Sequence, residues 1–463
     1  MAAPQRICDH RLRIGPRTGP DMLTPLRLVP APLRRRVLDS AAVPSDLAEV
    51  TTIAAGEEQP PASAGMTRAG VDAIWQATER LYATGMHPGI SLVLRRHGKI
   101  VLKRAIGHAR GNGPGDEGEK PVPMTPDTPV CIFSASKAMA ALPLHLLSER
   151  KELSLLDPVS HYLPEFGRNG KRDITIYQLL CHKAGIPTIP TDGTDVAELL
   201  LDRDAILRLI YRTAPDRPGR HHAYHALTAG FVVAALVEKV SGRSFRSYFR
   251  DQISKPLGLS SLDFGARGQT LRKVARNYVS GFRISAPVDM YLKRAIGTGL
   301  EHAVTLSNDP RYYQAVIPAG NGVATADDCS KLFQCLLDGG ELAGVRVLEP
   351  LTVRRAVAEV GKPELDRSLL VPLRYSAGMM LGASPWGLYG PDTPKAFGHL
   401  GFANIVVWAD RERDISAALL NTGKLVAGIH MPWLLALLGS ISRHCPKLSV
   451  TAQDRRLTAI GMN

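Results

Sequence analysis

The apolar positions at the start of the globular part of the chain predict one helix followed by two strands. A helix is expected from Thr67, a residue type that caps helices well, to about Tyr82. Two apolar runs, 90–96 and 100–106, flank the turn His97-Gly98 and predict a hairpin at the edge of a sheet. The globular fold is therefore expected to begin just before this helix.

The middle of the chain carries the apolar spacing of helices, in which positions three and four apart share a face. Gly242 follows the most apolar of these runs and is expected to end it. Residues 263–316 show no strong period, and Tyr291, Tyr312 and Tyr313 within them suggest an aromatic lid or pocket wall. Helices are expected over residues 135–147, 153–163, 174–181, 200–211 and 231–240.

The last third of the chain returns to the short apolar runs that are typical of strands. Thr325 to Asp328 has the form of a capping box and is expected to start a helix that ends at Gly339-Gly340. Strands from both ends of the chain would then enclose a helical middle. This order indicates one discontinuous unit of the α/β (α+β) class, an antiparallel sheet flanked by helices with an inserted all-helical subdomain. Strands are expected over residues 375–381, 396–399, 404–408 and 415–420, and a final amphipathic helix over 424–442.

Three regions follow from this pattern. Residues 66–445 are expected to form the folded domain, with the sheet part from 66–130 and 320–445 and the helical part from 135–315. Residues 1–65 are rich in Pro, Arg, Ala and Gly, and we expect a disordered or loosely ordered basic extension. An organelle presequence or a membrane-touching arm is the alternative. Residues 446–463 are expected to be a C-terminal tail.

Composition narrows the class of protein. The chain has 463 residues, of which 44% are apolar and 22% charged, as in ordinary globular proteins. The formal net charge is +14, but Lys and Arg are spread along the chain without an aromatic platform, which argues against nucleic-acid binding. The chain has neither a run of about 18 apolar residues nor a hydrophobic signal core, so we expect a cytoplasmic protein without a transmembrane segment. Peripheral membrane contact stays open. The six cysteines have no metal-ligand spacing and are expected to be free thiols.

One short segment, Cys131 to Lys137, offers the chemistry of a serine nucleophile. If residues 135–147 are helical, Ser134 and Lys137 are three positions apart and lie side by side. A lysine accepts a serine proton only when burial or nearby positive charge lowers its pKa, and the surrounding apolar side chains can supply that burial. The helix start would also offer free backbone N–H groups to an oxyanion.

Taken alone, a Ser-x-x-Lys pattern is weak evidence, because ordinary composition produces about one in a chain of this length. A second copy, Ser148 to Lys151, lies in a polar run at the far end of the same helix and is interpreted as a solvated terminus. The hypothesis gains from Tyr224, which stands near the start of another apolar helix and is expected to lie at its mouth.

Three segments stand in a fixed order: Ser134-Ala-Ser-Lys137, Tyr224-His-Ala226 and His399-Leu-Gly401. This arrangement resembles the serine β-lactamase and penicillin-binding-protein superfamily, in particular its class C β-lactamase-like esterases. The resemblance covers about residues 66–442 and implies a β-lactamase/transpeptidase-like fold. Further segments similar to those of the family are 174–187, 256–259 and 321–328.

The resemblance implies a role for each of these side chains. Ser134 would form the acyl-enzyme, Lys137 would accept or relay its proton, and Tyr224 would be the second base and the proton donor to the leaving group. A tyrosine near two cations can approach its anionic form, in which it is a competent base. The backbone N–H groups of Ser134 and Phe402 would form the oxyanion hole. The resemblance implies no cofactor and no metal.

Two departures from the family pattern bear on the substrate. Ala226 stands where β-lactamases carry an Asn that holds the amide of the antibiotic, and His399 stands where they carry a Lys that pairs with its carboxylate. Loss of both partners weakens the case for β-lactams or acidic peptides and resembles the esterase branch. His399 could tune Tyr224 by a hydrogen bond or by charge; a structural histidine is the alternative.

The remaining polar candidates have simpler interpretations. His182 is interpreted as a structural histidine with its hydrogen bonds satisfied. His221, His222 and His225 are close in sequence, but no acid or cysteine ligand accompanies them, so solvated loop positions are expected rather than a metal site. Asp327 and Asp328 are expected to cap a helix.

The leading hypothesis is a serine carboxylesterase, lipase-like or acyl-transferring, that acts on a small-molecule ester or acyl substrate. A β-lactamase or D-amino-acid peptidase is the alternative within the same fold. A catalytically silent structural or interaction protein is the alternative of another class. An α/β-hydrolase or a metallohydrolase is disfavoured, because the sequence has neither a Gly-x-Ser-x-Gly elbow nor a His-Glu-x-x-His motif.

Overall fold

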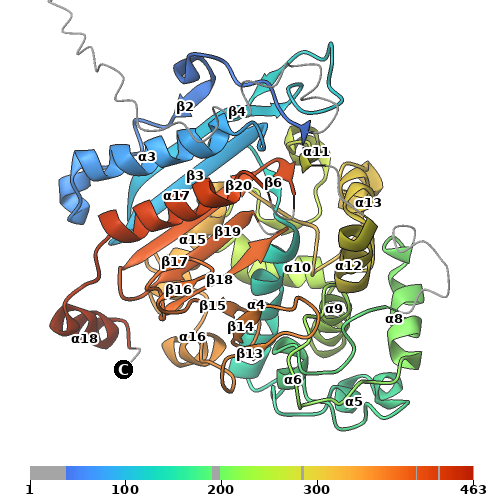
Figure 1. Cartoon of the computed structure of the whole chain (residues 1–463). Helices are drawn as coiled ribbons and strands as arrows, with labels where there is room; N and C mark the ends of the chain where they lie inside the picture. The colour runs from blue at the N-terminus through green and yellow to red at the C-terminus, as the bar shows by residue number, and fades with distance from the viewer. Residues whose placement is uncertain (1–37, 190–198, 283–285, 403, 426–427, 462–463) are drawn as a thin grey trace, which may run out of the picture.

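The fold is built on one large antiparallel sheet that joins the two ends of the chain (Figure 1). In this computed structural model the described residues are 38–189, 199–282, 286–402, 404–425 and 428–461. The strands follow the order β13-β14-β15-β18-β19-β20-β3-β4-β2, and β5 pairs with β4. Their bounds are β13 Glu364–Leu365, β14 Pro372–Tyr375, β15 Met380–Leu381, β18 Ala396–Gly401, β19 Ile405–Asp410, β20 Ile415–Asn421, β3 Gly89–Arg96, β4 Lys99–Arg110, β2 Thr51–Ile53 and β5 Val122–Pro123.

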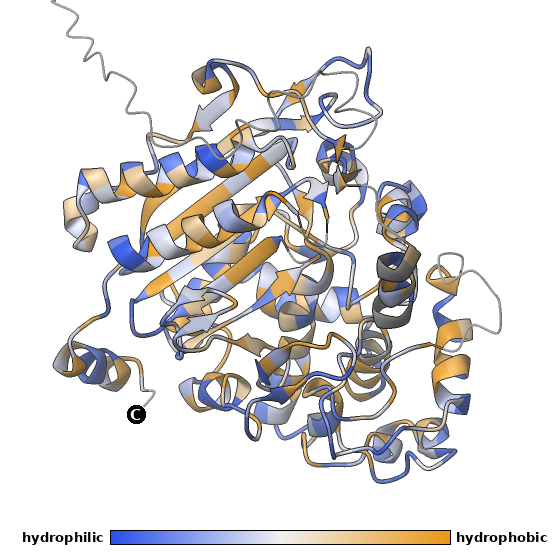
Figure 2. Cartoon of the chain, viewed as in Figure 1, coloured by the Kyte–Doolittle hydropathy of each residue, from blue (hydrophilic) through white to orange (hydrophobic). Residues whose placement is uncertain are grey.

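Helices cover both faces of this sheet. Strand β3 is buried along its whole length, and its alternate residues point to opposite faces. Leu92 and Leu94 pack with α3 (Arg68–Ala83) and α17 (Met431–His444) on one face. Val93 belongs to the core on the other face, where α4 (Ser136–Glu149) and α15 (Ala326–Leu337) lie. The central strands are accordingly hydrophobic in Figure 2.

The middle of the chain forms a helical part beside the sheet, as expected (Figure 1). Residues 263–316 add one helix of 11 residues and shorter helices of five to seven residues there. The shorter ones complete fewer than two turns, too few for sequence periodicity to reveal. The expected helix over 153–163 is shorter, since Pro158 precedes its first residue. The helices are α5 Val159–Tyr162, α6 Ile176–Leu180, α8 Arg203–Arg212, α9 Thr228–Ser241, α10 Phe245–Phe249, α11 Gly268–Lys273, α12 Ala286–Ile296, α13 Leu300–Leu306 and α14 Pro310–Gln314.

The expected start of the fold differs from the structure. The hairpin β3–β4 is present, but it is not at the edge of the sheet, because β2 pairs with β4 and β20 pairs with β3. Glu58 also holds Arg104 through two hydrogen bonds of 2.8 Å each. Part of the expected extension therefore belongs to the folded domain, although a three-residue strand is too short for its periodicity to show. Residues 1–37 lie outside the described residues.

The end of the chain differs in a similar way. The last helix of the sheet layer, α17, begins at Met431 rather than at 424, since Gly423–Lys424 forms strand β21. The expected tail contains α18 (Val450–Ala459). Arg456 on α18 forms ion pairs of 2.6 Å with both Asp338 and Asp414, and these contacts attach the helix to the domain. Among the helices of the described residues, none has the length and apolarity needed to cross a bilayer.

Candidate active site

Ser134 and Lys137 lie beside each other, as the sequence predicts. Ser134 occupies a 3₁₀ turn, Phe133–Ala135, that leads directly into α4. Lys137 Nζ lies 3.0 Å from Ser134 Oγ and donates a hydrogen bond of 2.9 Å to the carbonyl of Ala319. The second Ser-x-x-Lys copy is at the exposed end of the same helix, where Lys151 faces solvent.

Burial favours the uncharged form of Lys137. Its side chain is almost inaccessible, and within the described part of the chain its surroundings supply desolvation rather than an acidic partner. Desolvation therefore holds the pKa of Lys137 well below its ordinary value. An uncharged amine has a lone pair, so Lys137 can accept the hydroxyl hydrogen of Ser134.

Tyr224 completes the group, but not at the mouth of a helix. Helix α9 begins four residues later, at Thr228, and Tyr224 lies in the preceding loop. Lys137 Nζ is 4.8 Å from the centre of its ring, and the phenol has a side-chain hydrogen bond with Ser134. The ring also packs against the His182 imidazole at 4.8 Å between centroids. These contacts bring a serine, an amine and a phenol together.

The expectation of a readily ionised tyrosine is wrong. Burial raises the pKa of Tyr224 above its ordinary value, and the hydrogen bond from Ser134 offsets only part of this. Burial also disfavours the charged forms of the two expected cations, because it lowers the pKa of Lys137 and brings that of His399 to about 3. Tyr224 is therefore a protonated phenol at neutral pH, suited to donate a proton.

His399 lies on β18, near the phenol. Its Nδ1 is 2.7 Å from the carbonyl of Leu400, and because a carbonyl only accepts, Nδ1 carries the hydrogen. Nε2 is then a lone-pair acceptor, buried and without a hydrogen-bond partner. The imidazole and the Tyr224 ring are 6.2 Å apart between centroids. The position offers an uncharged acceptor where the β-lactamase motif that the sequence resembles has a lysine.

Phe402 lies at the end of β18, directly after the third motif. Gly401 permits a close backbone approach there, because a Cβ at this position would meet the carbonyl oxygen of Ile132 at 2.2 Å. Phe133 and Phe402 both have left-handed backbone conformations, with φ of 46° and 47°, and their rings meet edge to face at 5.0 Å. The segments that carry the Ser134 and Phe402 amides are thus adjacent.

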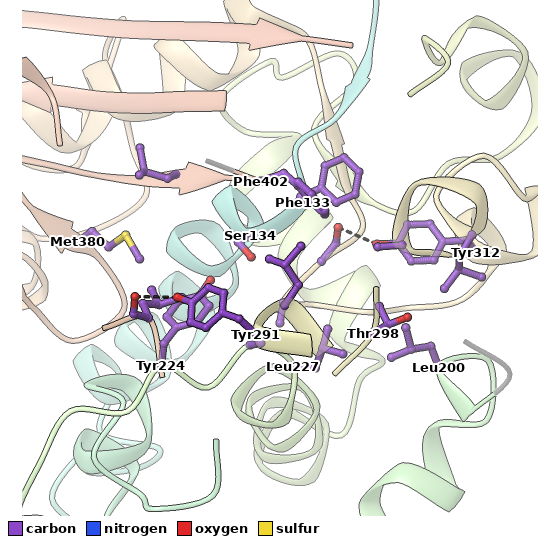
Figure 3. A pocket seen from close by; sticks show the side chains of 18 of the residues that line it. Phe133, Ser134, Leu200, Tyr224, Leu227, Tyr291, Thr298, Tyr312, Met380 and Phe402 are labelled. Carbon is purple, nitrogen blue, oxygen red and sulfur yellow. Dashed lines mark hydrogen bonds between the residues drawn. The ribbon is translucent and has the colours of Figure 1, made fainter. Parts of the chain in front are cut away.

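A cavity of about 320 Å³ opens in front of Ser134 (Figure 3). Tyr224, Tyr291 and Met380 lie on one side of Ser134, and Tyr312, Thr298 and Leu200 on the other. As expected, Tyr291 and Tyr312 line the wall; Tyr313 is buried behind it. Among the described residues, the lining includes no charged side chain. The apolar lining consists of Phe133, Leu200, Ala226, Leu227, Leu292, Ala303, Leu306, Ala319, Leu369, Val371, Met380, Leu400 and Phe402.

The neighbouring histidines have structural contacts. His182 Nδ1 accepts the backbone N–H of His225 at 3.1 Å, and His225 Nε2 accepts that of Ile186 at 3.1 Å. His222 donates from Nδ1 to the carbonyl of Cys181 at 2.7 Å. The expectation of solvated loop positions is wrong for His222 and His225, which are buried by the packing around Tyr224. Groups of side chains that could hold a metal ion are absent from the described residues.

The acidic side chains at the start of α15 have contacts beyond capping. Thr325 caps the helix, but Asp327 pairs with Arg95 at 2.5 Å. Asp328 accepts the backbone N–H groups of Ser260 and Ser261 at 2.9 and 2.7 Å. The five cysteines of the described residues are free and buried, as predicted, and Cys8 lies outside these residues.

Sequence reasoning missed one residue that shapes the site. Asp366 is fully buried and accepts from the backbone N–H of Tyr224 at 3.1 Å and from the hydroxyl of Tyr375 at 3.0 Å. It also accepts the N–H groups of Ser368 and Leu369, so it ties the tyrosine loop to the cavity wall. An Asp followed two residues later by Ser is a turn signal, but turns of this type are too common to single it out.

The arrangement of sheet and helices, together with the site around Ser134, is that of the β-lactamase-like serine hydrolase fold. The chain belongs to the Beta-lactamase family, which it matches over residues 76–438. The esterase/beta-lactamase LipL of Mycobacterium tuberculosis is 30% identical over 323 residues, which cover 65% of this chain and 70% of that protein. A putative D-alanyl-D-alanine carboxypeptidase of Escherichia coli K12 is 23% identical over 351 residues, 72% of this chain and 78% of the relative.

Solved structures agree on the fold. A penicillin-binding protein homologue from Caulobacter crescentus has a TM-score of 0.70 at 27% identity, covering 82% of this chain and 98% of its own. A family VIII carboxylesterase has a TM-score of 0.68 at 25% identity, and the match covers 81% of this chain and 98% of the carboxylesterase. The predicted superfamily and fold class are therefore confirmed, and the relatives include proteins described as esterases.

Proposed function

We propose that this protein is a carboxylesterase that forms an acyl-enzyme on Ser134. The observation that carries the proposal is the buried Lys137 amine, which lies 3.0 Å from the Ser134 hydroxyl at the wall of an apolar cavity and whose pKa burial holds well below its ordinary value. Relatives described as an esterase/beta-lactamase and a family VIII carboxylesterase support the same reaction class. The substrate is an ester whose acyl group is uncharged and apolar.

Acylation follows from the contacts of the three side chains. Ser134 Oγ attacks the ester carbonyl carbon while its proton passes to the lone pair of Lys137. The carbonyl oxygen becomes an oxyanion, which the N–H groups of Ser134 and Phe402 stabilise. Tyr224 donates its phenolic proton to the leaving alkoxide, and the phenolate takes back a proton from the Lys137 ammonium. The alcohol departs and the acyl group stays on Ser134.

Deacylation repeats these steps with water in place of the alcohol. Tyr224 and Lys137 together accept a proton from the attacking water, and the second tetrahedral intermediate occupies the same pair of amides. Collapse of this intermediate breaks the bond to Ser134 Oγ, which recovers its hydrogen. The carboxylic acid leaves, and Lys137 is again an uncharged amine.

The cavity favours an ester over a β-lactam. Ala226 offers no side-chain hydrogen bond to an amide, and His399 is uncharged, with its pKa at about 3. A substrate carboxylate would thus enter an apolar site without a cation among the described lining residues, at the cost of desolvating its charge. The apolar side chains instead match a hydrocarbon acyl group.

A β-lactamase is the second candidate, because the relative that is 30% identical carries both activities in its name. Peptidase activity of the D-amino-acid type is disfavoured for the reason just given, since such substrates carry a carboxylate. Comparing turnover of short p-nitrophenyl esters with that of a chromogenic cephalosporin separates the candidates. Ester turnover at least tenfold above cephalosporin turnover, compared as kcat/KM, is expected.

Ser134→Ala tests the nucleophile directly. It should abolish ester turnover and labelling by a fluorophosphonate probe, because the nucleophilic oxygen is removed. Ser148→Ala is the matched control, since Ser148 belongs to the second Ser-x-x-Lys copy of the same helix, and it should keep both. A wild-type protein that neither labels nor turns over esters would instead be the catalytically silent member of the fold.

A further inference from the structure

A second buried lysine lies behind the proposed oxyanion hole. Lys424 is the last residue of β21, and its side chain is fully buried. Its Nζ donates to the backbone carbonyl of Asn421 at 2.5 Å and to the Asn421 side-chain oxygen at 3.2 Å. Within the described part of the chain, no carboxylate acts on this amine. Burying an amine at this position costs desolvation free energy, so we ask which contacts of Lys424 offset that cost.

On one side Lys424 contacts the turn of the nucleophile. Its Nζ lies 5.3 Å from the centre of the Phe133 ring, a cation–π distance. Phe133 directly precedes Ser134 and has a left-handed backbone conformation, with φ of 46°. A bulky residue keeps this conformation only when its surroundings enforce it. The Phe133 ring is held between Lys424 and the ring of Phe402.

On the other side Lys424 connects to the turn that carries Phe402. Asn421, at the end of β20, donates from its side-chain amide to the carbonyl of Asn404 at 2.9 Å. Asn404 lies just before β19 and donates to the carbonyl of Leu425 at 3.2 Å. His430 Nε2 lies 3.0 Å from the Asn404 side-chain oxygen. Lys424 thus holds the Asn421 side chain, and the Asn421 side chain in turn holds Asn404, next to the segment that carries Phe402.

We propose that Lys424 is a positioning residue for the oxyanion hole, fixing through Phe133 and Asn421 the two backbone segments that carry the Ser134 and Phe402 amides. This inference rests on the proposed function. The residue does not line the cavity, so its effect reaches the reaction only through these segments. Burial lowers the pKa of its amine to about 7, which reflects the same lack of solvent and of a carboxylate partner.

Lys424→Met tests the proposal against a matched control. Lys171 is also fully buried, donates to the carbonyls of Arg168 and Tyr211 at 2.9 and 3.0 Å, and lies 5.8 Å from the Phe166 ring. None of these residues lines the cavity. Lys171→Met therefore removes a buried lysine of the same kind from the helical part of the fold.

The expected result is a selective loss of kcat. For p-nitrophenyl esters, Lys424→Met should lower kcat by about 10- to 100-fold with KM within about twofold, since complete loss of one oxyanion donor costs about 100- to 1,000-fold. The rate of fluorophosphonate labelling of Ser134 should fall in parallel, because that adduct also places an oxygen in the hole. Lys171→Met should change neither rate by more than about twofold, whatever it does to stability.

A second variant keeps the test decisive if Lys424→Met does not fold. Asn421→Ser keeps the backbone carbonyl that holds Lys424 but removes the amide that reaches Asn404, and it should lower kcat at least fivefold with KM unchanged. A folded Lys424→Met protein with wild-type kcat, or equal losses in Lys171→Met, would overturn the inference while the proposed function stands. A wild-type protein without esterase activity or labelling would overturn both.

Discussion

Lys137 Nζ lies 3.0 Å from Ser134 Oγ and donates its second hydrogen bond to a backbone carbonyl, that of Ala319, rather than to an acid. Burial without an acidic partner favours the uncharged form of the Lys137 amine in this pair. A carboxylate beside Lys137 would hold the amine in its charged form, in which it has no lone pair to offer. This relationship underlies the predictions for the pH dependence and for each proton transfer.

The esterase activity should rise with pH as Lys137 loses its proton. Burial holds the pKa of Lys137 well below its ordinary value, so the rising limb of kcat/KM against pH should also lie well below pH 10. Lys137→Met should remove the activity at every pH. A limb that persists at the same pH in a variant retaining some activity, such as Lys137→Arg, would assign the titration to another group.

The same shift predicts how stability depends on pH. Between the lowered pKa of folded Lys137 and the ordinary value near 10.4, the unfolded chain binds one proton more, so raising the pH favours the folded state. The free energy of unfolding should therefore rise less steeply with pH in Lys137→Met, by up to about 1.4 kcal/mol per pH unit. Lys255→Met, at an exposed lysine, is the control and should keep the wild-type slope in urea unfolding.

Tyr224→Phe should affect poor leaving groups most. A phenol whose pKa is raised by burial acts as a proton donor, and an alkoxide needs that proton more than p-nitrophenolate does. We expect kcat for an alkyl ester to fall by about 100-fold or more, and that for the p-nitrophenyl ester by clearly less. Tyr291→Phe is the control, since its hydroxyl donates to the Leu369 carbonyl at 2.7 Å. Equal losses for both leaving groups would contradict the donor role.

The length of the accepted acyl chain should depend on the free volume of the cavity. Leu306, on α13, is buried against the cavity, and Leu306→Trp should fill part of its volume of about 320 Å³. Turnover of longer p-nitrophenyl esters should then fall at least tenfold relative to the acetate. Leu351→Trp, at an exposed position on α16 (Pro350–Ala356), is the control for the added indole. An unchanged chain-length profile would place the acyl group elsewhere.

Two truncations test where the folded domain begins. A protein that starts at residue 38 should unfold like the full chain in urea if residues 1–37 add no stabilising contacts. One that starts at residue 66 loses the pairing of β2 with β4 and leaves Arg104, which is buried, without Glu58. Breaking such a pair costs about 3–5 kcal/mol, and a loss of at least this size is expected. If the two truncated proteins were equally stable, the folded domain would begin at residue 66, as the sequence predicts.

Prediction from the sequence succeeded where the signal was periodic or fixed by backbone geometry. The helix after Thr67 forms with the expected cap, and the Thr67 hydroxyl accepts the N–H of Gly70 at 3.0 Å. Gly242 ends α9 in a left-handed conformation, as a glycine after an apolar helix does. Prediction from the sequence failed for β2 and α18, because these elements are held in place by partners that are distant in sequence rather than by a periodic pattern of their own.

The amino-acid sequence by itself determined the layers of the fold and the pairing of Ser134 with Lys137, because helical spacing forces residues three apart onto one face. Tertiary structure decided the pKa values of the groups in the site. Only the packed fold buries Lys137, Tyr224 and His399 together, and desolvation then lowers the pKa of Lys137 and of His399 and raises that of Tyr224, in each case toward the uncharged form. The contact of Lys424 with Phe133 likewise joins segments almost 300 positions apart, which no local pattern can indicate.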